Sequence, residues 1–275
     1  PGPILTPDER RLLDALSDQA ALAIERVNLA RDFDNAMRAA ERDKLRAALL
    51  TSISHDLRTP LASILGAADS LASLPDLAQR DRGELLATIQ EEAERLNRFI
   101  ANLLDMTRLE SGAVEPNMSL EDVGEVVGTA LRRAERILAG HRVETGIEPG
   151  LPLVRLDAVL FEQVLFNLLD NAAKYAPAGS TIHVQGWRAG HSVKLQVLDE
   201  GGGIPPEDLE RIFDKFYRVR KGDSQRAGTG LGLAVCRGFV EAMGGSIEAR
   251  NDEGGGAAFT ITLPVPRHEE TESGP

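Results

Sequence analysis

The stretch NLLDNAAKYAP, Asn167 to Pro177, is the most informative segment in the second half of the chain. Asn167, Asn171 and Lys174 recur at i, i+4 and i+7, so they share one face of the helix that the stretch predicts. Such a polar stripe can simply face solvent. Amide oxygens, however, are ligands for Mg²⁺, and a lysine ammonium pairs with phosphate. Taken alone, the stripe leaves both interpretations open.

Helices and short strands alternate around this stretch. Ser119-x-x-Asp122 predicts a capping box that opens a helix to about Arg136. Asp157 predicts the N-cap of the helix that ends near Tyr175. The other expected elements are strands at 142–147, 152–155, 181–187, 192–198, 246–250 and 257–263, and a helix from 231. Helices mixed with mostly antiparallel strands predict an α/β sandwich, in which a sheet carries helices on one face.

Two glycine-rich stretches follow. DEGGGI, Asp199 to Ile204, comes directly after an apolar strand, and GTGLGL, Gly228 to Leu233, leads into a helix. Each pattern is weak alone, but together they predict two backbone loops that closely approach one ligand. The free N–H groups at the start of a helix favour a phosphate there. Neither stretch is a Walker A loop or a Rossmann fingerprint, because the required lysine or glycine spacing is missing.

The segment between the glycine loops is rich in aromatic and basic side chains. IFDKFYRV, Ile212 to Val219, holds Phe213, Phe216 and Tyr217, in a chain with only 4% aromatic residues. Basic residues are also frequent from 205 to 227: Arg211, Lys215, Arg218, Arg220, Lys221 and Arg226. The composition predicts a lid that folds over an anionic ligand. A surface loop with a small core of its own is the alternative.

Residues 8–112 predict helices and almost no strand. Apolar residues at heptad-like spacing favour a dimeric coiled coil over one amphipathic helix on a monomeric core: Leu13, Leu16, Ala20, Ala23, Val27, Ala30 and Met37. Ser73–Gly83 predicts a break, and the second helix is expected to end near Gly112, a suitable C′ residue. Two such hairpins would bury their apolar faces as a four-helix bundle.

The bulk properties exclude some classes. The formal net charge of the 275-residue chain is −12, which argues against a nucleic-acid surface. The single cysteine, Cys236, excludes an internal disulfide and fits a reducing compartment. No apolar run reaches the roughly 20 residues of a membrane span, and we expect no signal peptide. Because the first residue is Pro1, we expect a fragment of a longer protein, in which a membrane anchor or a sensor domain lies upstream of this chain. A disordered tail is expected at 267–275.

Five motifs in order resemble the H, N, G1, F and G2 boxes of sensor histidine kinases. They are SHDLRTPL, NLLDNAAKY, DEGGGI, IFDKFYRV and GTGLGL, and the resemblance covers about residues 45–266. It implies a helical-hairpin dimerisation and phosphotransfer domain at 45–112, which forms a four-helix bundle in the homodimer. An α/β-sandwich ATP-binding domain would follow at 113–266. Residues 1–44 look like a signalling helix or coiled coil at the end of a GAF-type domain.

The resemblance also implies roles for residues of the first motif. His55 would accept a phosphoryl group from ATP, and Asp56 would orient or deprotonate it. The group would then pass to an aspartate in the receiver domain of a response regulator. Thr59, four residues after His55, would hold the water that hydrolyses the regulator's phospho-aspartate.

The remaining motifs imply an ATP·Mg²⁺ site. Asn171 would bind Mg²⁺ with Asn167 nearby, and Asp199 would accept a hydrogen bond from the adenine amino group. The other implied contacts are Gly201 and Gly203 beside the base, Lys174, Tyr175 and Arg218 beside the phosphates or ribose, and Gly228, Thr229, Gly230, Leu231 and Gly232 along the triphosphate.

Two other functions stay open at this point. An ATPase of the Hsp90, gyrase B or MutL type resembles the same nucleotide-binding fold, but it leaves the setting of His55 on a helix hairpin unexplained. A non-catalytic dimerising scaffold would make His55 an ordinary surface histidine. Phosphorylation of the protein itself, as opposed to release of free phosphate, separates these alternatives.

Overall fold

The computed structural model describes residues 57–74, 77–219 and 230–266, and isolated helical positions between residues 8 and 37. The chain divides into two compact units, residues 1–62 and 63–275. Every described residue of the first unit is helical. None of the described helices is long and apolar enough to cross a membrane. Most of the heptad-like seam and the predicted tail at 267–275 lie outside the described residues.

Within the second unit, a helical hairpin is formed by residues 63–73 and by α2, Gln79–Glu110. Helix α2 begins before the predicted end of the break at Gly83, because one interior glycine costs only about 1 kcal/mol of helix stability. At its other end, Gly112 has φ +65° and its N–H donates to the carbonyl of Leu109 at 3.2 Å. The prediction of Gly112 as the C′ residue is therefore confirmed.

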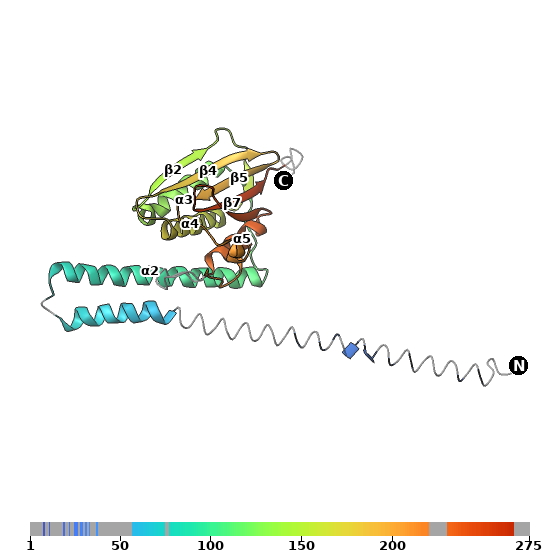
Figure 1. The fold of residues 1–275 in the computed structure, drawn as a ribbon, viewed down its shortest axis with the longest axis horizontal. Coiled ribbons are helices and arrows are strands. Elements are labelled where there is room, and N and C mark those ends of the chain that lie inside the picture. Colours follow the sequence, from blue (N-terminus) through green and yellow to red (C-terminus); the bar gives the residue numbers. More distant parts are fainter. Residues whose placement is uncertain are drawn as a thin grey trace. The chain divides into compact units, whose positions relative to one another are not determined.

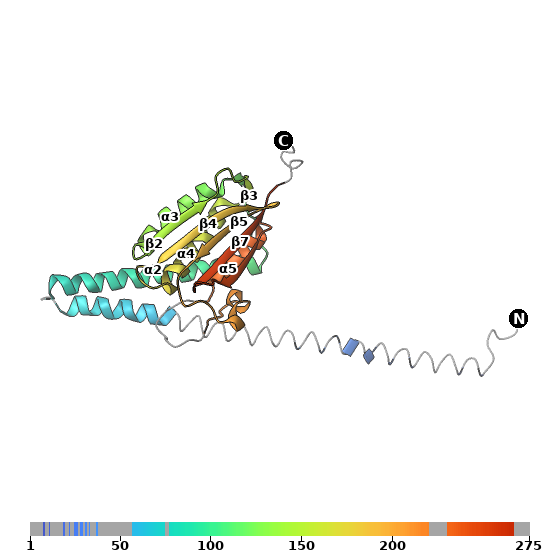
Figure 2. The same cartoon turned by 45° about the horizontal axis from the view of Figure 1, so that its top comes forward.

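The second half is an α/β sandwich, as predicted. Its five-stranded sheet has the order β2-β4-β5-β7-β6, with β2 and β4 parallel and the other pairs antiparallel. The strands are β2 Arg142–Ile147, β4 Thr181–Ala189, β5 Ser192–Leu198, β6 Ser246–Asn251 and β7 Ala257–Pro264. Helices α3 Val123–Leu138, α4 Ala158–Tyr175 and α5 Gly232–Ala242 cover one face of the sheet (Figures 1 and 2).

Alternation along the strands and a broad apolar face on α4 build the core between the layers. On β5, Val193, Leu195 and Val197 are buried, whereas the residues between them are partly exposed. Phe161 and Leu165 on α4 are also buried. These buried side chains pack α4 against the sheet. The polar stripe of α4 therefore lies at the edge of the packed core.

The predicted capping box at Ser119 was wrong. Ser119 lies in β1 (Ser119–Glu121), which pairs antiparallel with β3 (Val154–Leu156) in a separate two-stranded sheet. The cap lies three residues later, where the Asp122 carboxylate accepts the N–H of Gly124 at 2.7 Å. Asp157 caps α4 as predicted and also accepts the N–H of Asn117. The missed strand β1 is only three residues long, too short to show an alternating pattern.

Candidate functional site

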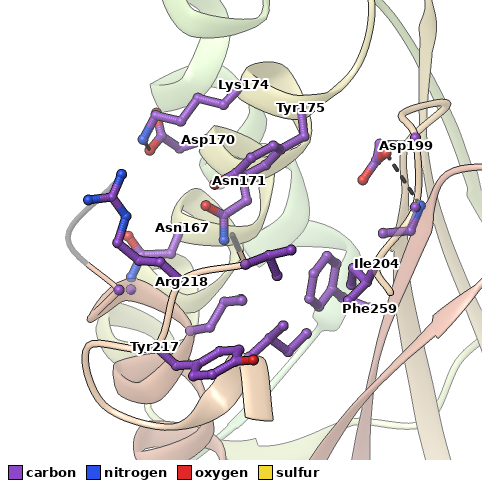
Figure 3. A pocket seen from close by; sticks show the side chains of 18 of the residues that line it. Asn167, Asp170, Asn171, Lys174, Tyr175, Asp199, Ile204, Tyr217, Arg218 and Phe259 are labelled. Carbon is purple, nitrogen blue, oxygen red and sulfur yellow. Dashed lines mark hydrogen bonds and ion pairs between the residues drawn. The ribbon is translucent and has the colours of Figure 1, made fainter. Parts of the chain in front are cut away.

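A pocket of about 520 Å³ opens beside α4 (Figure 3). It brings together residues from α4, the loop after β5, the segment 205–219 and the start of α5. The sequence-predicted residues that line it are Asn167, Asn171, Lys174, Tyr175, Asp199, Gly203, Arg218, Gly230 and Gly232. Asn167, Asp170 and Arg218 lie on one side of the pocket and Asp199 lies on the opposite side. Segments far apart in sequence therefore form one site.

Asp199 supplies a buried carboxylate to the pocket wall, with only 4% of its surface exposed. Its Oδ1 accepts the N–H groups of Gly201 at 2.8 Å and Ala257 at 3.3 Å. Burial raises the pKa of Asp199, and the two backbone hydrogen bonds oppose that shift. No hydrogen bond to Oδ2 is found within the described residues, so this oxygen can accept one from a ligand.

Glycines allow the backbone to close tightly around Asp199. A Cβ atom on Gly201 would lie 2.7 Å from the Asp199 Oδ1 and 2.9 Å from the Tyr175 carbonyl oxygen. Gly256 has φ +96°, and a Cβ there would lie 1.8 Å from the Asp199 carbonyl oxygen. The sequence analysis missed Gly256, although the run GGG at 254–256 was a readable signal.

Asn251 is a second residue that the sequence analysis missed. Its Oδ1 accepts the N–H of Ile204 and its Nδ2 donates to the carbonyl of Ile204, both at 2.7 Å. This two-sided bond holds the loop next to Gly203, which has φ +68°. A single asparagine at the end of a strand carries no sequence pattern that would have revealed this contact.

The polar stripe of α4 contains an unpartnered group. The Nδ2 of Asn167 is buried and has no hydrogen-bond partner in the part of the chain that is described. The Asn167 amide carbon lies 4.0 Å from the Cβ position of Gly232, at the start of α5. Because an unsatisfied buried donor costs about 1–3 kcal/mol, this amide is suited to a ligand oxygen.

The Cys236 thiol lies beside the Asn167 amide and is unreactive because it is buried. Its thiol is fully buried and contacts the carbonyl of Val164 at 3.7 Å. Burial raises the pKa of Cys236 to about 12, and the neighbouring Asn167 amide only partly opposes the shift. The thiol therefore stays protonated and is part of the packing between α4 and α5.

Lys174 forms an ion pair with Asp170, one helical turn earlier on the same face. Asp170 also lines the pocket and was not among the predicted residues. The pair balances the charge of the lysine where the resemblance implied a phosphate contact. A bound phosphate would have to share Lys174 with Asp170.

The segment 205–219 is joined to Gly230 of the second glycine motif. The N–H of Phe216 donates to the Gly230 carbonyl at 2.9 Å, and Phe216 itself has a positive φ of 62°. A Cβ on Gly230 would lie 2.7 Å from the Phe216 carbonyl carbon, so only glycine fits. The Tyr217 hydroxyl donates to Asp208, and this bond raises the pKa of Tyr217. The two predicted ligand-facing segments therefore meet at the pocket.

Six other predicted site residues lie elsewhere or cannot be placed. The Leu231 side chain is fully buried and belongs to the core. Thr59 is exposed in the helical residues 57–73. His55, Asp56 and the glycine-loop residues Gly228 and Thr229 lie outside the described residues. The described residues contain no cluster of three or more His, Cys, Asp or Glu side chains that could hold a metal.

Two protein-family models match the chain. The His Kinase A (phospho-acceptor) domain matches residues 45–112. The histidine kinase-, DNA gyrase B- and HSP90-like ATPase domain matches residues 156–267. Except for Asn102, the residues that line the pocket lie within the second match, and this match implies ATP binding. The chain therefore belongs to the sensor histidine kinases.

Within that family the chain is close to the sensor proteins named KdpD. It is 40% identical to Sensor protein KdpD of Clostridium acetobutylicum over 265 residues, or 96% of this chain and 29% of the relative. It is 39% identical to Sensor protein KdpD of Escherichia coli over 271 residues, or 98% of this chain and 30% of that relative. The chain thus spans less than a third of the length of these relatives.

Solved structures support the fold. The histidine kinase AdeS of Acinetobacter baumannii superposes with a TM-score of 0.60 at 27% identity, over 78% of this chain and 98% of that one. The histidine kinase ThkA, solved in complex with the response regulator protein TrrA, superposes with a TM-score of 0.63. At 21% identity, over 82% of this chain and 64% of ThkA, this second match concerns the fold alone.

Proposed function

We propose that this chain is the catalytic part of a sensor kinase that phosphorylates His55 with ATP. The observation that carries the proposal is the buried Asp199 carboxylate, whose Oδ1 is occupied by two backbone N–H groups while Oδ2 remains for the pocket. This arrangement suits the exocyclic amino group of adenine. The first helical domain would be residues 45–112 and the ATP-binding domain residues 113–266, after a signalling segment at 1–44.

The rest of the pocket fits a triphosphate. The unpartnered Asn167 amide can donate to a phosphate oxygen, and Asn171 presents an amide from the same helix face. Arg218 adds positive charge on this side, whereas the charge of Lys174 is balanced by Asp170. When bound, Mg²⁺ would neutralise phosphate charge, with Asn171 as the protein ligand. The glycines at 201, 203 and 230 let the backbone approach the nucleotide.

Phosphoryl transfer would proceed by positioning and charge neutralisation. A neutral imidazole nitrogen of His55 would attack the γ-phosphorus, forming a P–N bond as the bond to the β,γ-bridging oxygen breaks and ADP leaves. Asp56 would accept the hydrogen bond, or the proton, of the other ring nitrogen and keep the attacking nitrogen unprotonated.

The partners follow from the same proposal. The chain would act as a homodimer whose helical hairpins form a four-helix bundle. It would pass the phosphoryl group to an aspartate in a response-regulator receiver domain, as the ThkA–TrrA complex illustrates for another kinase. The similarity to KdpD sensor proteins favours a KdpE-like regulator and a potassium or osmotic signal. The chain would be the cytoplasmic portion of a membrane-anchored sensor.

Labelling with γ-labelled ATP and Mg²⁺ tests the kinase proposal. We expect an acid-labile, alkali-stable phosphoryl label on the protein, and we expect His55→Gln to abolish it because the nucleophile is gone. The variant should bind ATP as the parent chain does, which controls for the pocket. Release of free phosphate with no labelled protein would instead favour an ATPase of the Hsp90 type. Absence of nucleotide binding would favour a scaffold.

Thr59 supports a second activity, dephosphorylation of the regulator. It is exposed on the helical segment 57–73, where a hydroxyl can hold a water for attack on a phospho-aspartate. We expect Thr59→Ala to leave autophosphorylation within about twofold and to slow regulator dephosphorylation about 100-fold, the lower end of the range typical of one positioned catalytic group. Decay of a purified phosphorylated receiver, with and without ADP, measures it. Thr59→Ser is the control and should retain activity; equal decay with Thr59→Ala would contradict the assignment.

A further inference from the structure

One side of α2 makes a continuous series of contacts with the ATP-binding domain. Glu94 forms an ion pair with Arg136 of α3 at 2.6 Å. Asp105 accepts a hydrogen bond from Gln163 of α4. Because positions 94, 102, 105 and 109 fall within about a quarter of the helix circumference, these contacts come from one face. We call the residues Glu94, Asn102, Asp105 and Leu109, together with Glu110 that follows at their C-terminal end, the α2 stripe.

The C-terminal end of the stripe packs against α5 and the segment 205–219. Leu109 fills the space over Gly238, where an added Cβ would lie 2.5 Å from the Leu109 Cδ1. Glu110 forms an ion pair with Lys215 at 2.6 Å. The ATP-binding domain is therefore seated on α2 by one close apolar contact and several polar bonds.

The middle of the stripe reaches the pocket. Asn102 of α2 is one of the residues that line it, together with Asn167 and Asp170 of α4. Asp105, one turn after Asn102, bonds Gln163, and Gln163 lies one turn before Asn167. These contacts place Asn102 on the Asn167 side of the pocket. In Figure 3 the Asn167 side lies opposite Asp199. If the adenine binds at Asp199, as proposed above, this is the phosphate side.

We propose that Asn102 is a nucleotide-binding residue contributed by α2, whose amide donates a hydrogen bond to the terminal phosphate of ATP. The inference rests on the proposed nucleotide function of the pocket. It also has a regulatory consequence. A ligand that binds more tightly when the ATP-binding domain is docked on α2 must stabilise that docking by the same factor. ATP therefore holds the domain on the α2 stripe more firmly than ADP does.

Titration calorimetry with the whole chain and Mg²⁺ tests the contact. We expect Asn102→Ala to weaken ATP binding about tenfold, because a hydrogen bond to a charged phosphate is lost. ADP lacks the γ-phosphate, which is the terminal phosphate of ATP, so its affinity should change less than about twofold. Asn97→Ala is the matched control, since Asn97 is an exposed asparagine of the same helix. Its ATP affinity should equal that of the parent chain.

A second variant separates the contact from a general loss of stability. Gly238→Leu fills the space that Leu109 occupies and should unseat the domain from α2, while Leu109→Ala in the same chain should restore the fit. In the Gly238→Leu background, Asn102→Ala should no longer affect ATP affinity, and in the doubly substituted chain its effect should return. Hydrogen exchange at residues 94–110 should slow more with a non-hydrolysable ATP analogue than with ADP.

The outcomes distinguish the two proposals. A parent chain that fails to bind ATP would overturn the proposed function of the pocket. A parent chain that binds ATP, with Asn102→Ala and Asn97→Ala indistinguishable from it, would overturn only the role of Asn102. An equal loss for ATP and ADP would likewise contradict a contact with the terminal phosphate.

Discussion

Asp199→Asn is expected to weaken ATP binding by about 2 to 4 kcal/mol, or roughly 30- to 1000-fold in Kd. The carboxylate must present two acceptor oxygens, because Oδ1 already accepts the N–H groups of Gly201 and Ala257. An asparagine has one acceptor oxygen and one donor group. In either orientation of the asparagine side chain, its NH₂ group therefore faces another hydrogen-bond donor. That donor is a backbone N–H group in one orientation and the adenine amino group in the other. Calorimetric titration of ATP measures the loss.

A nucleotide without the amino group provides the control for this prediction. Purine riboside triphosphate should bind the parent chain much more weakly than ATP, because it leaves the Asp199 Oδ2 buried without a partner. The Asp199→Asn chain should bind the two nucleotides with similar affinity. Asp252→Asn, at an exposed position on the turn between β6 and β7, should leave both affinities unchanged. If the Asp199→Asn chain still preferred ATP as strongly as the parent chain does, Asp199 would not be the residue that recognises the adenine amino group.

Gly256→Ala is expected to be the most damaging small substitution in the domain. Its Cβ would lie 1.8 Å from the Asp199 carbonyl oxygen, far inside the contact distance, and its φ of +96° is costly for any residue with a side chain. The backbone segments that contain Gly256 and Asp199 must move apart, so we expect a loss of about 4 kcal/mol or more in the free energy of unfolding. Urea unfolding followed by circular dichroism measures it.

The neighbouring Gly255 distinguishes backbone strain from steric collision as the cause of this loss. Gly255 also has a positive φ, +90°, but a Cβ there would meet its nearest atom, the Gly201 carbonyl oxygen, at an ordinary 3.9 Å. Gly255→Ala should therefore cost only the backbone strain, about 1 to 2 kcal/mol. Equal losses at 255 and 256 would mean that strain, and not the collision with Asp199, explains the effect.

The predictions made from local patterns succeeded where the signal itself is local. The Gly112 cap and the Asp157 cap depend on residues within one helical turn, and both are confirmed. The Ser119 capping box failed because pairing of β1 with the distant β3 outweighed a local cap. Asn251 was not predicted for the same reason, since its partner Ile204 lies 47 residues away in the chain. Gly256 belongs to the run GGG at 254–256, which is readable in the sequence, but its contact with the distant Asp199 is not.

The sequence alone determined the family, the α/β sandwich and the stripe of Asn167, Asn171 and Lys174 on one helix face. These features follow from side-chain periodicity and from glycines at fixed spacing, which the linear chain records. Only the tertiary structure decided that Asp199 is buried with one carboxylate oxygen hydrogen-bonded to the backbone. It also decided that Lys174 is paired with Asp170 and that Asn102 of α2 lines the pocket. Burial and pairing are properties of atoms that folding brings together across the chain, so no local pattern of residues encodes them.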